Sequence, residues 1–119
     1  MCQSCVPHDH GGVFEHGKEK MPPTSDFSLV ADVFKKLDDP SRLRIFWLLC
    51  HCEECVINLS AMMEMSSPAV SHHLKILRSA GLIVSRREGK EVYYRAADTA
   101  QCQTLHETIE RIMEISCPR

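Results

Sequence analysis

The sequence has no long apolar run and no start typical of a secreted protein. No stretch approaches the roughly 18 apolar residues that a membrane-spanning helix needs, and the opening MCQSCVPHDHGG lacks the basic and apolar regions of a secretory signal. Repeats and low-complexity segments are missing as well. The 119 residues suffice for one compact domain, so we expect a cytoplasmic protein with no membrane partner.

The sequence also lacks the side-chain patterns on which catalysis depends. It shows no pair of acid and base carboxylates, no phosphate-binding loop and no nucleophile paired with a base. Two Cys-x-x-Cys segments, Cys2 to Cys5 and Cys52 to Cys55, have the spacing of thiol oxidoreductases, but such motifs are expected beside a βαβ unit, which the pattern does not contain. We therefore predict no enzymatic activity and no organic cofactor, with a thiol oxidoreductase as a remote alternative.

A strong net charge is missing, yet the charge is unevenly distributed. The chain carries −2 in total, whereas the segment from Ser66 to Arg95 has six basic and two acidic residues, hence +4, which leaves −6 for the rest. Local charge decides where a polyanion docks. The segment is therefore a candidate nucleic-acid surface, although a charge cluster can equally be a solvated face.

Composition divides the chain at residue 25. Residues 1–25 hold several glycines and prolines and few large apolar residues, a composition typical of a mobile arm. Residues 26–119 show regular apolar periodicity. We predict a flexible N-terminal tail that contains Cys and His, followed by one folded domain.

The periodicity of the domain predicts a mainly helical fold. Apolar residues recur at helical spacing over 27–37, 40–50, 56–65, 67–80 and 98–117. Asp39, Ser67 and Asp98 are predicted N-caps, and Gly81 is a predicted helix stop. Between the last two helices, LIVSRR and EVYYR flank EGK, which indicates a β-hairpin. A short helix, a Ser-capped helix and a basic hairpin in this order predict a winged helix-turn-helix, mainly α with a small β-hairpin wing.

The predicted helix over 67–80 has two different faces. Val70, His73, Leu74 and Leu77 share one face, which we expect to be buried, with His73 as a core histidine and not a ligand. The other face and the hairpin carry polar and basic residues suited to phosphates and base edges. The predicted DNA-contacting residues are Ser66, Ser67, Ser71, His72, Lys75, Arg78, Arg86, Arg87 and Lys90.

Three segments in this order resemble the ArsR/SmtB family of metal-responsive bacterial repressors. They are DPSRLRI, VSHHLKIL and AGLIVSRREGKEVYY, and the resemblance covers about residues 27 to 117. It implies a homodimer that pairs through the first and last helices, binds an inverted repeat in double-stranded operator DNA, and leaves it when an inducer binds. The apolar stripe on the last helix independently calls for a partner.

The resemblance implies a candidate zinc site, because one class of repressors in this family has such a site on the last helix, formed by two acids and two histidines. The matching positions here are Asp98, Ala100, Arg111 and Glu114. Both histidines are missing, so we expect that site to be lost. A rival pair one turn apart, His106 and Glu110, is interpreted as an exposed, solvated pair.

The resemblance also implies a candidate cysteine site. A second class of repressors in this family binds metals through Cys-x-Cys or Cys-x-Cys-x-x-Cys at the start of the helix before the recognition helix. Aligned on SHH, only Cys55 falls on that pattern, because Ile57 occupies the next position. Cys50, Cys52 and Cys55 nevertheless form Cys-x-Cys-x-x-Cys about five residues upstream. Three thiolates on one bend suit a thiophilic metal or metalloid ion of the cadmium, zinc, lead or arsenite class.

Two further interpretations concern the remaining thiols and imidazoles. Cys2, Cys5, His8 and His10 of the tail are additional candidate ligands that fold over a partner subunit. The odd number of cysteines, seven, speaks against a disulfide framework. The closest alternative keeps the fold and DNA binding but reads thiol oxidation or persulfide formation at Cys50, Cys52 or Cys55.

Overall fold

The computed structural model describes residues 11–117. Within the chain, two compact units are distinguished, Met1–Asp32 and Val33–Arg119. Helix α2 (Thr24–Lys36) runs across the boundary. None of the described helices is long and apolar enough to cross a membrane.

The described part of the first unit is helical and exposed. Helix α1 (Val13–Lys20) follows Gly12, whose φ of 84° lies in the left-handed region, and none of its residues is buried. This helix was not expected from the sequence, because its apolar residues are too few to show a period. In α2, the large apolar side chains of Phe27, Leu29 and Val30 are also exposed.

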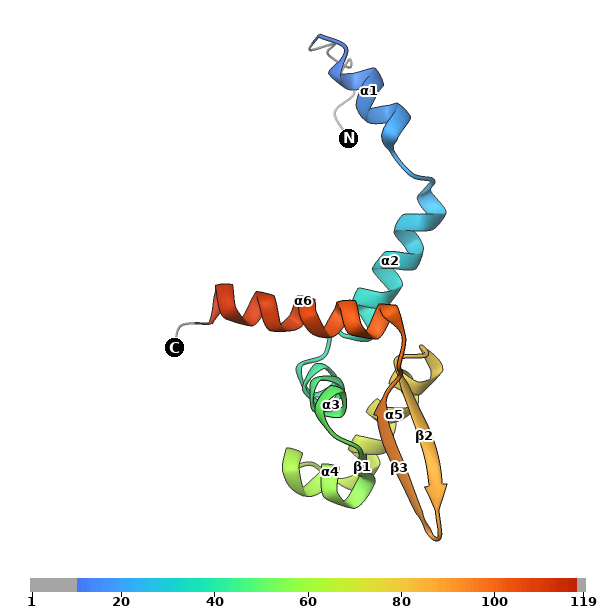
Figure 1. The fold of residues 1–119 in the computed structure, drawn as a ribbon, viewed down its shortest axis with the longest axis vertical. Helices are drawn as coiled ribbons and strands as arrows, with labels where there is room; N and C mark the ends of the chain where they lie inside the picture. Colours follow the sequence, from blue (N-terminus) through green and yellow to red (C-terminus); the bar gives the residue numbers. More distant parts are fainter. Residues whose placement is uncertain (1–10, 118–119) are drawn as a thin grey trace. The chain divides into compact units, whose positions relative to one another are not determined.

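The second unit has its core between three helices and the base of a hairpin (Figure 1). Helices α3 (Pro40–His51), α4 (Val56–Met63) and α5 (Ser67–Ser79) occur where the sequence predicted them. The largest fully buried side chains come from all of these parts: Ile45, Phe46, Leu59, Val70, Leu74, Leu77, Leu82 and Ile83. Burying such side chains stabilises a fold by about 1.5–3 kcal/mol each before entropy is counted, so the helices hold one another in place.

Two of the three predicted helix caps are wrong by one residue. Asp39 caps α3 as predicted, because its Oδ2 accepts from the Arg42 backbone N–H at 2.8 Å. Helix α5 is capped by Ser66 instead of Ser67, since the Ser66 Oγ accepts from the Ala69 N–H at 3.3 Å. The last helix, α6 (Ala100–Ser116), is capped by Thr99 and not by Asp98. In each pair both residues are good caps, and the path of the backbone selects one.

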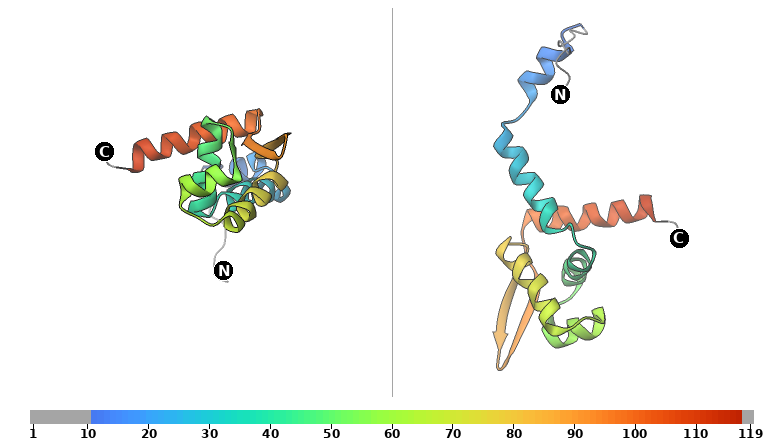
Figure 2. Two further views of the ribbon diagram at one scale, coloured as in Figure 1. Left: turned by 90° about the horizontal axis from the view of Figure 1, so that it is seen from below. Right: turned by 180° about the vertical axis from the view of Figure 1, so that it is seen from behind.

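The hairpin supplies two strands of a three-stranded antiparallel sheet in the order β1-β3-β2, with β3 in the middle. Strands β2 (Ile83–Glu88) and β3 (Glu91–Ala96) pair from Ile83↔Ala96 to Glu88↔Glu91. Their turn contains Gly89 with φ of 63°. The hairpin extends past the helices of the second unit in Figure 1 and in the right-hand view of Figure 2. Strand β1 (Glu54–Cys55) pairs with β3 through Cys55↔Tyr93. It was not predicted, because two residues show no alternation.

Helix α6 is buried at its start and exposed near its end. Cys102 is 3% exposed and its thiol donates to the Leu82 carbonyl at 3.3 Å. Leu105 and Ile109 pack against the core, whereas Ile112 and Ile115 are 55% and 71% exposed. An apolar surface is thus left uncovered on the last turns of this helix.

Candidate nucleic-acid interface and metal-binding residues

Helices α4 and α5 with the β2–β3 hairpin form the predicted winged helix-turn-helix. Every residue predicted to contact DNA is exposed: Ser66, Ser67, Ser71, His72, Lys75, Arg78, Arg86, Arg87 and Lys90. A groove of about 400 Å³ lies beside α5, lined by Ser71, Lys75 and Arg78 together with Leu74, Ser79 and Tyr94. The polar face of α5 and the hairpin turn are therefore both exposed to solvent.

His73 lies on the inner side of α5, where the sequence placed it. Its side chain is 12% exposed, with Nδ1 at 3.2 Å from a guanidinium nitrogen of Arg42 and Nε2 at 3.6 Å from Asp39 Oδ2. Burial lowers the pKa of His73, against the opposing effect of the Asp39 carboxylate. His73 thus links α5 to the start of α3 and is no part of the exposed face.

Arg86 is exposed but forms ion pairs with residues of its own chain. Its guanidinium forms ion pairs with Glu53 and Glu88, at 2.6 Å each, and lies over the Tyr93 ring at 4.9 Å. The hydrogen bonds that Arg86 donates to Glu53 and Glu88 raise its pKa above the ordinary range. Among the described residues, no ion pair engages Lys75, Arg78, Arg87 or Lys90, so these four are the freer cations for DNA.

The three clustered cysteines do not converge. Cys50 lies in the last turn of α3, Cys52 ends that helix and donates its thiol to the Leu48 carbonyl at 3.4 Å, and Cys55 is buried in β1. Among the described residues, their sulfurs belong to no group of three potential ligands within 4.8 Å. The four tail candidates, Cys2, Cys5, His8 and His10, lie outside the described residues. The thiolate metal site stays a prediction.

Cys50 and Cys52 line a hollow of about 500 Å³ at the junction of α3, β3 and α6. Cys102, His51 and His106 line the same hollow. Burial raises the pKa of Cys50 to about 11, with a smaller contribution from Cys102. Burial also raises the pKa of Cys52. Both thiols therefore carry their protons at neutral pH.

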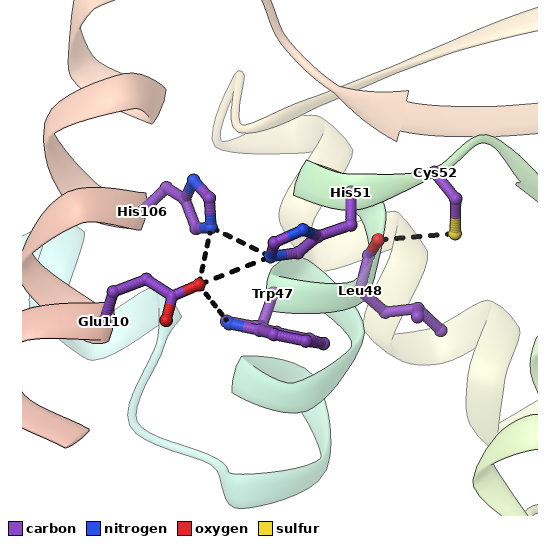
Figure 3. Close-up of polar contacts among 6 residues, drawn as sticks. All are labelled: Trp47, Leu48, His51, Cys52, His106 and Glu110. Carbon is purple, nitrogen blue, oxygen red and sulfur yellow. Dashed lines mark hydrogen bonds and ion pairs between the residues drawn. The ribbon is translucent and has the colours of Figure 1, made fainter. Parts of the chain in front are cut away.

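One group of three potential metal ligands does converge in the described part of the chain, namely His51, His106 and Glu110 (Figure 3). His106 Nε2 is 3.0 Å from His51 Nε2 and 3.1 Å from Glu110 Oε1, and His51 Nε2 is 3.4 Å from the same oxygen. The indole N–H of Trp47 donates to Glu110 Oε1 at 3.1 Å. His106 and Glu110, interpreted from the sequence as an exposed, solvated pair, are partly exposed and are joined by His51 and Trp47.

This cluster could be found only in part from the sequence. His106 and Glu110 are one helical turn apart, a spacing that puts them on one face of α6. His51 is 55 residues away from His106, and only the packing of α3 against α6 brings it to the pair. Burial by itself raises the pKa of Glu110, but the hydrogen bonds from Trp47 and His106 outweigh it and the pKa is lowered.

The four positions that correspond to a zinc site on the last helix form no such site in the structure. Asp98 accepts a long hydrogen bond, at 3.5 Å, from the Gln103 amide. Further along α6, Glu114 pairs with Arg111 at 3.0 Å.

The fold and its exposed face define a winged helix-turn-helix regulator. Residues 39–85 match the model of the bacterial regulatory proteins of the arsR family. The crystal structure of a Mycobacterium bovis fragment, described as a possible transcriptional regulatory protein, is similar, with a TM-score of 0.63 and 32% sequence identity. The match covers 74% of this chain and 94% of that fragment. The chain belongs to the ArsR family.

Two curated relatives are similar over the same region. The transcriptional repressor SmtB homolog of a Synechocystis strain is 44% identical over 71% of this chain and 64% of its own length. The arsenical resistance operon repressor of Escherichia coli is 43% identical over 58% of this chain and 60% of its own length. The matched region therefore spans less than two thirds of either relative. Both names are those of regulators and not of enzymes.

Proposed function

We propose that this protein is a transcriptional repressor that binds operator DNA as a homodimer and leaves it when a thiophilic metal or metalloid ion binds. The observation that carries the DNA-binding part is the exposed polar face of α5 beside a basic hairpin, within a domain of the ArsR family. The names of the relatives support the regulatory part. A repressor of this kind acts in the cytoplasm, where its operator is.

Each part of this surface has its own role on DNA. Ser66, Ser67 and Ser71 lie at the start of α5, where free N–H groups and the helix dipole favour phosphate oxygens. Lys75, one turn further, reaches a base edge or a phosphate. Arg87 and Lys90 flank the hairpin turn and add affinity that depends on salt and not on sequence.

Uncovered apolar side chains of α2 and α6 support the proposed dimer. Phe34 of α2 is 62% exposed, in addition to Ile112 and Ile115 of α6. The Mycobacterium bovis fragment is described as a homodimeric winged helix-turn-helix domain in solution, with a TM-score of 0.69 at 29% identity. A two-fold dimer sets two recognition helices about 34–36 Å apart, in successive major grooves of an inverted repeat.

The proposed inducer is an ion of the cadmium, zinc, lead or arsenite class. The donors proposed for it are Cys50, Cys52 and Cys55, with Cys2, Cys5, His8 and His10 of the tail. In the described structure, the sulfurs of Cys50, Cys52 and Cys55 are not close enough together to bind one ion as three or four ligands. Binding at these thiols therefore requires that the segment after α3 rearranges, or that donors come from residues 1–10.

Thiol oxidation is the second candidate signal. A redox sensor needs a thiolate at neutral pH. The pKa of Cys50 is raised to about 11 and that of Cys52 is raised as well. A metal ion is also held by the thiolate form of cysteine, so these pKa values do not separate the two signals. We place metal binding ahead of oxidation or persulfide formation because a relative of this chain is named for arsenical resistance.

The test is release of DNA by ions. Purified protein should bind DNA from upstream of its own gene, with a steep salt dependence in fluorescence anisotropy, and should release it on addition of cadmium, zinc, lead or arsenite. The variant with Cys50, Cys52 and Cys55 changed to Ser should keep DNA binding and lose the response. Cys102→Ser is the matched control, because Cys102 is a buried thiol outside the cluster.

Several outcomes of this experiment discriminate between the parts of the proposal. If neither an ion nor an oxidant changes the DNA affinity, the sensing part is wrong. If removing residues 1–20 alone abolishes the response, the ligands are mainly those of the tail. Native mass spectrometry separates metal from oxidation, as added metal mass or as lost hydrogens.

The two neighbouring arginines of β2 should contribute differently to DNA affinity. Arg87→Ala removes a cation without an ion pair in the described structure and should reduce the slope of log K against log salt by about 0.9. Arg86→Ala should change the slope less, because Glu53 and Glu88 already neutralise Arg86. Anisotropy titrations at several salt concentrations measure both slopes. Equal changes for the two variants would show that Arg86 leaves its acidic partners on DNA.

A further inference from the structure

We propose that His51, His106 and Glu110 form a binding site for a divalent cation of the zinc type, separate from the clustered cysteines. The site joins the end of α3 to the middle of α6 (Figure 3). It goes beyond the proposed function, because it is defined by metal binding in the absence of DNA. Its three ligands are also different residues from the four positions of the last helix that match the zinc site of related repressors.

The spacing of the three ligand atoms suits a tetrahedral ion. Zinc binds imidazole nitrogen and carboxylate oxygen at about 2.0–2.2 Å, so two ligands of a tetrahedral ion are about 3.3–3.6 Å apart. The three distances here are 3.0, 3.1 and 3.4 Å. Adjustments of a few tenths of an ångström, within the reach of side-chain rotation, complete the triangle.

A network of hydrogen bonds alone does not satisfy these atoms. A neutral imidazole carries one N–H, so the Nε2 of His106 cannot fully donate both to His51 and to Glu110. The Oε1 of Glu110 faces both imidazole nitrogens and also accepts from Trp47. A cation between the three ligands replaces the shared proton and is attracted by the carboxylate.

The surrounding residues orient the ligands and leave the site open. The Trp47 indole holds the carboxylate of Glu110, as outer partners of metal ligands commonly do, and its ring lies 4.2 Å from the ring of His51. The side chains of His51, His106 and Glu110 are 42%, 28% and 41% exposed. An ion can therefore enter from solvent, and a water molecule can complete its coordination.

The donor set selects the class of ion. Two imidazoles and one carboxylate suit zinc and other divalent ions of borderline softness, whereas arsenite and lead favour thiolates. Cadmium or arsenite at the cysteines and zinc at this cluster are thus separate events. Loss of one leaves the other measurable.

The experiment measures zinc binding to the full-length metal-free protein. Native mass spectrometry gives the zinc stoichiometry of the wild type, His106→Ala, Glu110→Gln and the control His72→Ala, which removes an exposed histidine of α5 outside the cluster. His106→Ala and Glu110→Gln should each bind one zinc ion fewer per protomer, and His72→Ala should bind as many as the wild type. Equal stoichiometry in all four proteins would overturn the proposal.

A second measurement needs no variant. Nitrogen-detected NMR of the histidine side chains should show shifts of the His51 and His106 imidazole signals on addition of zinc, and no shift for His72. If zinc at saturation leaves the first two unchanged, the cluster is a hydrogen-bonded link between α3 and α6 only. Failure of zinc to release DNA leaves these results unaffected and bears only on the proposed function.

Trp47 is the positioning residue of the site. Trp47→Phe keeps an aromatic ring beside His51 but removes the hydrogen bond to Glu110. The zinc affinity should fall about 10- to 100-fold with the stoichiometry unchanged. A lost ion instead of a weaker one would mean that Trp47 supports the fold and not the ligand, and an unchanged affinity would contradict its positioning role.

Discussion

Histidine has two different environments in this protein. His73 is enclosed between Arg42 and Asp39 in the wall of the core, and burial lowers its pKa. His106 faces a partly open cluster with His51 and Glu110. The same side chain is thus a structural link in one place and a candidate ligand in the other, and the difference lies in which elements pack around it.

The lowered pKa of His73 predicts a loss of stability in mild acid. The folded state disfavours the protonated ring, so the unfolded state takes up the proton first. The contribution of His73 to stability is complete above the unfolded pKa of about 6.5 and is lost as the pH falls through the lower folded pKa. Urea unfolding between about pH 7.5 and 5.5 should show this decline. In His73→Gln the decline should be smaller, and an equal decline in both proteins would contradict the assignment.

At the scale of elements, the helix boundaries depend on which of two adjacent caps the backbone selects. The Thr99 N–H bonds to the Ala97 carbonyl, and the Ala97 N–H bonds to Leu82, at 3.0 Å each. These bonds fix the chain as it leaves β3 and turn the Thr99 hydroxyl toward the Cys102 N–H at 3.2 Å. Asp98 is left outside the helix start, where it accepts from the Gln103 amide at 3.5 Å.

The cap of α6 provides a stability test with an internal control. Thr99→Ala removes the hydroxyl that accepts from Cys102 and should lower the free energy of unfolding by about 1 kcal/mol. Asp98→Ala should change it by a few tenths of that. Denaturant unfolding of both variants measures the difference. A larger effect at Asp98 would restore the assignment made from the sequence.

At the scale of the whole molecule, the segment with the clustered cysteines is attached to the wing. Strand β1 pairs with β3 through Cys55↔Tyr93, and Glu53 pairs with Arg86 of β2. A rearrangement between Cys52 and Cys55 would therefore disturb the hairpin directly. This is a physical route by which binding at these thiols changes the surface proposed to meet DNA.

The proposed dimer predicts a change of mass with one charged substitution on α6. Ile112→Lys places a charge on the uncovered apolar face and should convert the dimer to a monomer in analytical ultracentrifugation. Glu107→Lys is the matched control, because five residues along a helix place it about 140° around the axis. A dimer that survives Ile112→Lys with wild-type affinity would exclude this face from the interface.

The sequence predicted most of the fold but only part of the candidate sites. Helices α2 to α6 and the hairpin carry strong periods and caps, and they occur where expected. Strand β1 is too short to show a period, and the helix caps were displaced by one residue where two good caps adjoin. Arg86 was assigned to DNA alone, because its pairing with Glu53 joins residues 33 positions apart.

The sequence by itself determined helices α2 to α6, the hairpin, the polar face of α5 and the family, since these depend on local periodicity and on contiguous motifs. Only the tertiary structure decided which potential ligands meet. Cys50, Cys52 and Cys55 are close in the chain but their sulfurs do not form one ligand group, because they lie in a helix end, at its C-cap and in a strand. His51, His106 and Glu110 meet because α3 packs against α6, and packing between distant segments leaves no sign in local sequence.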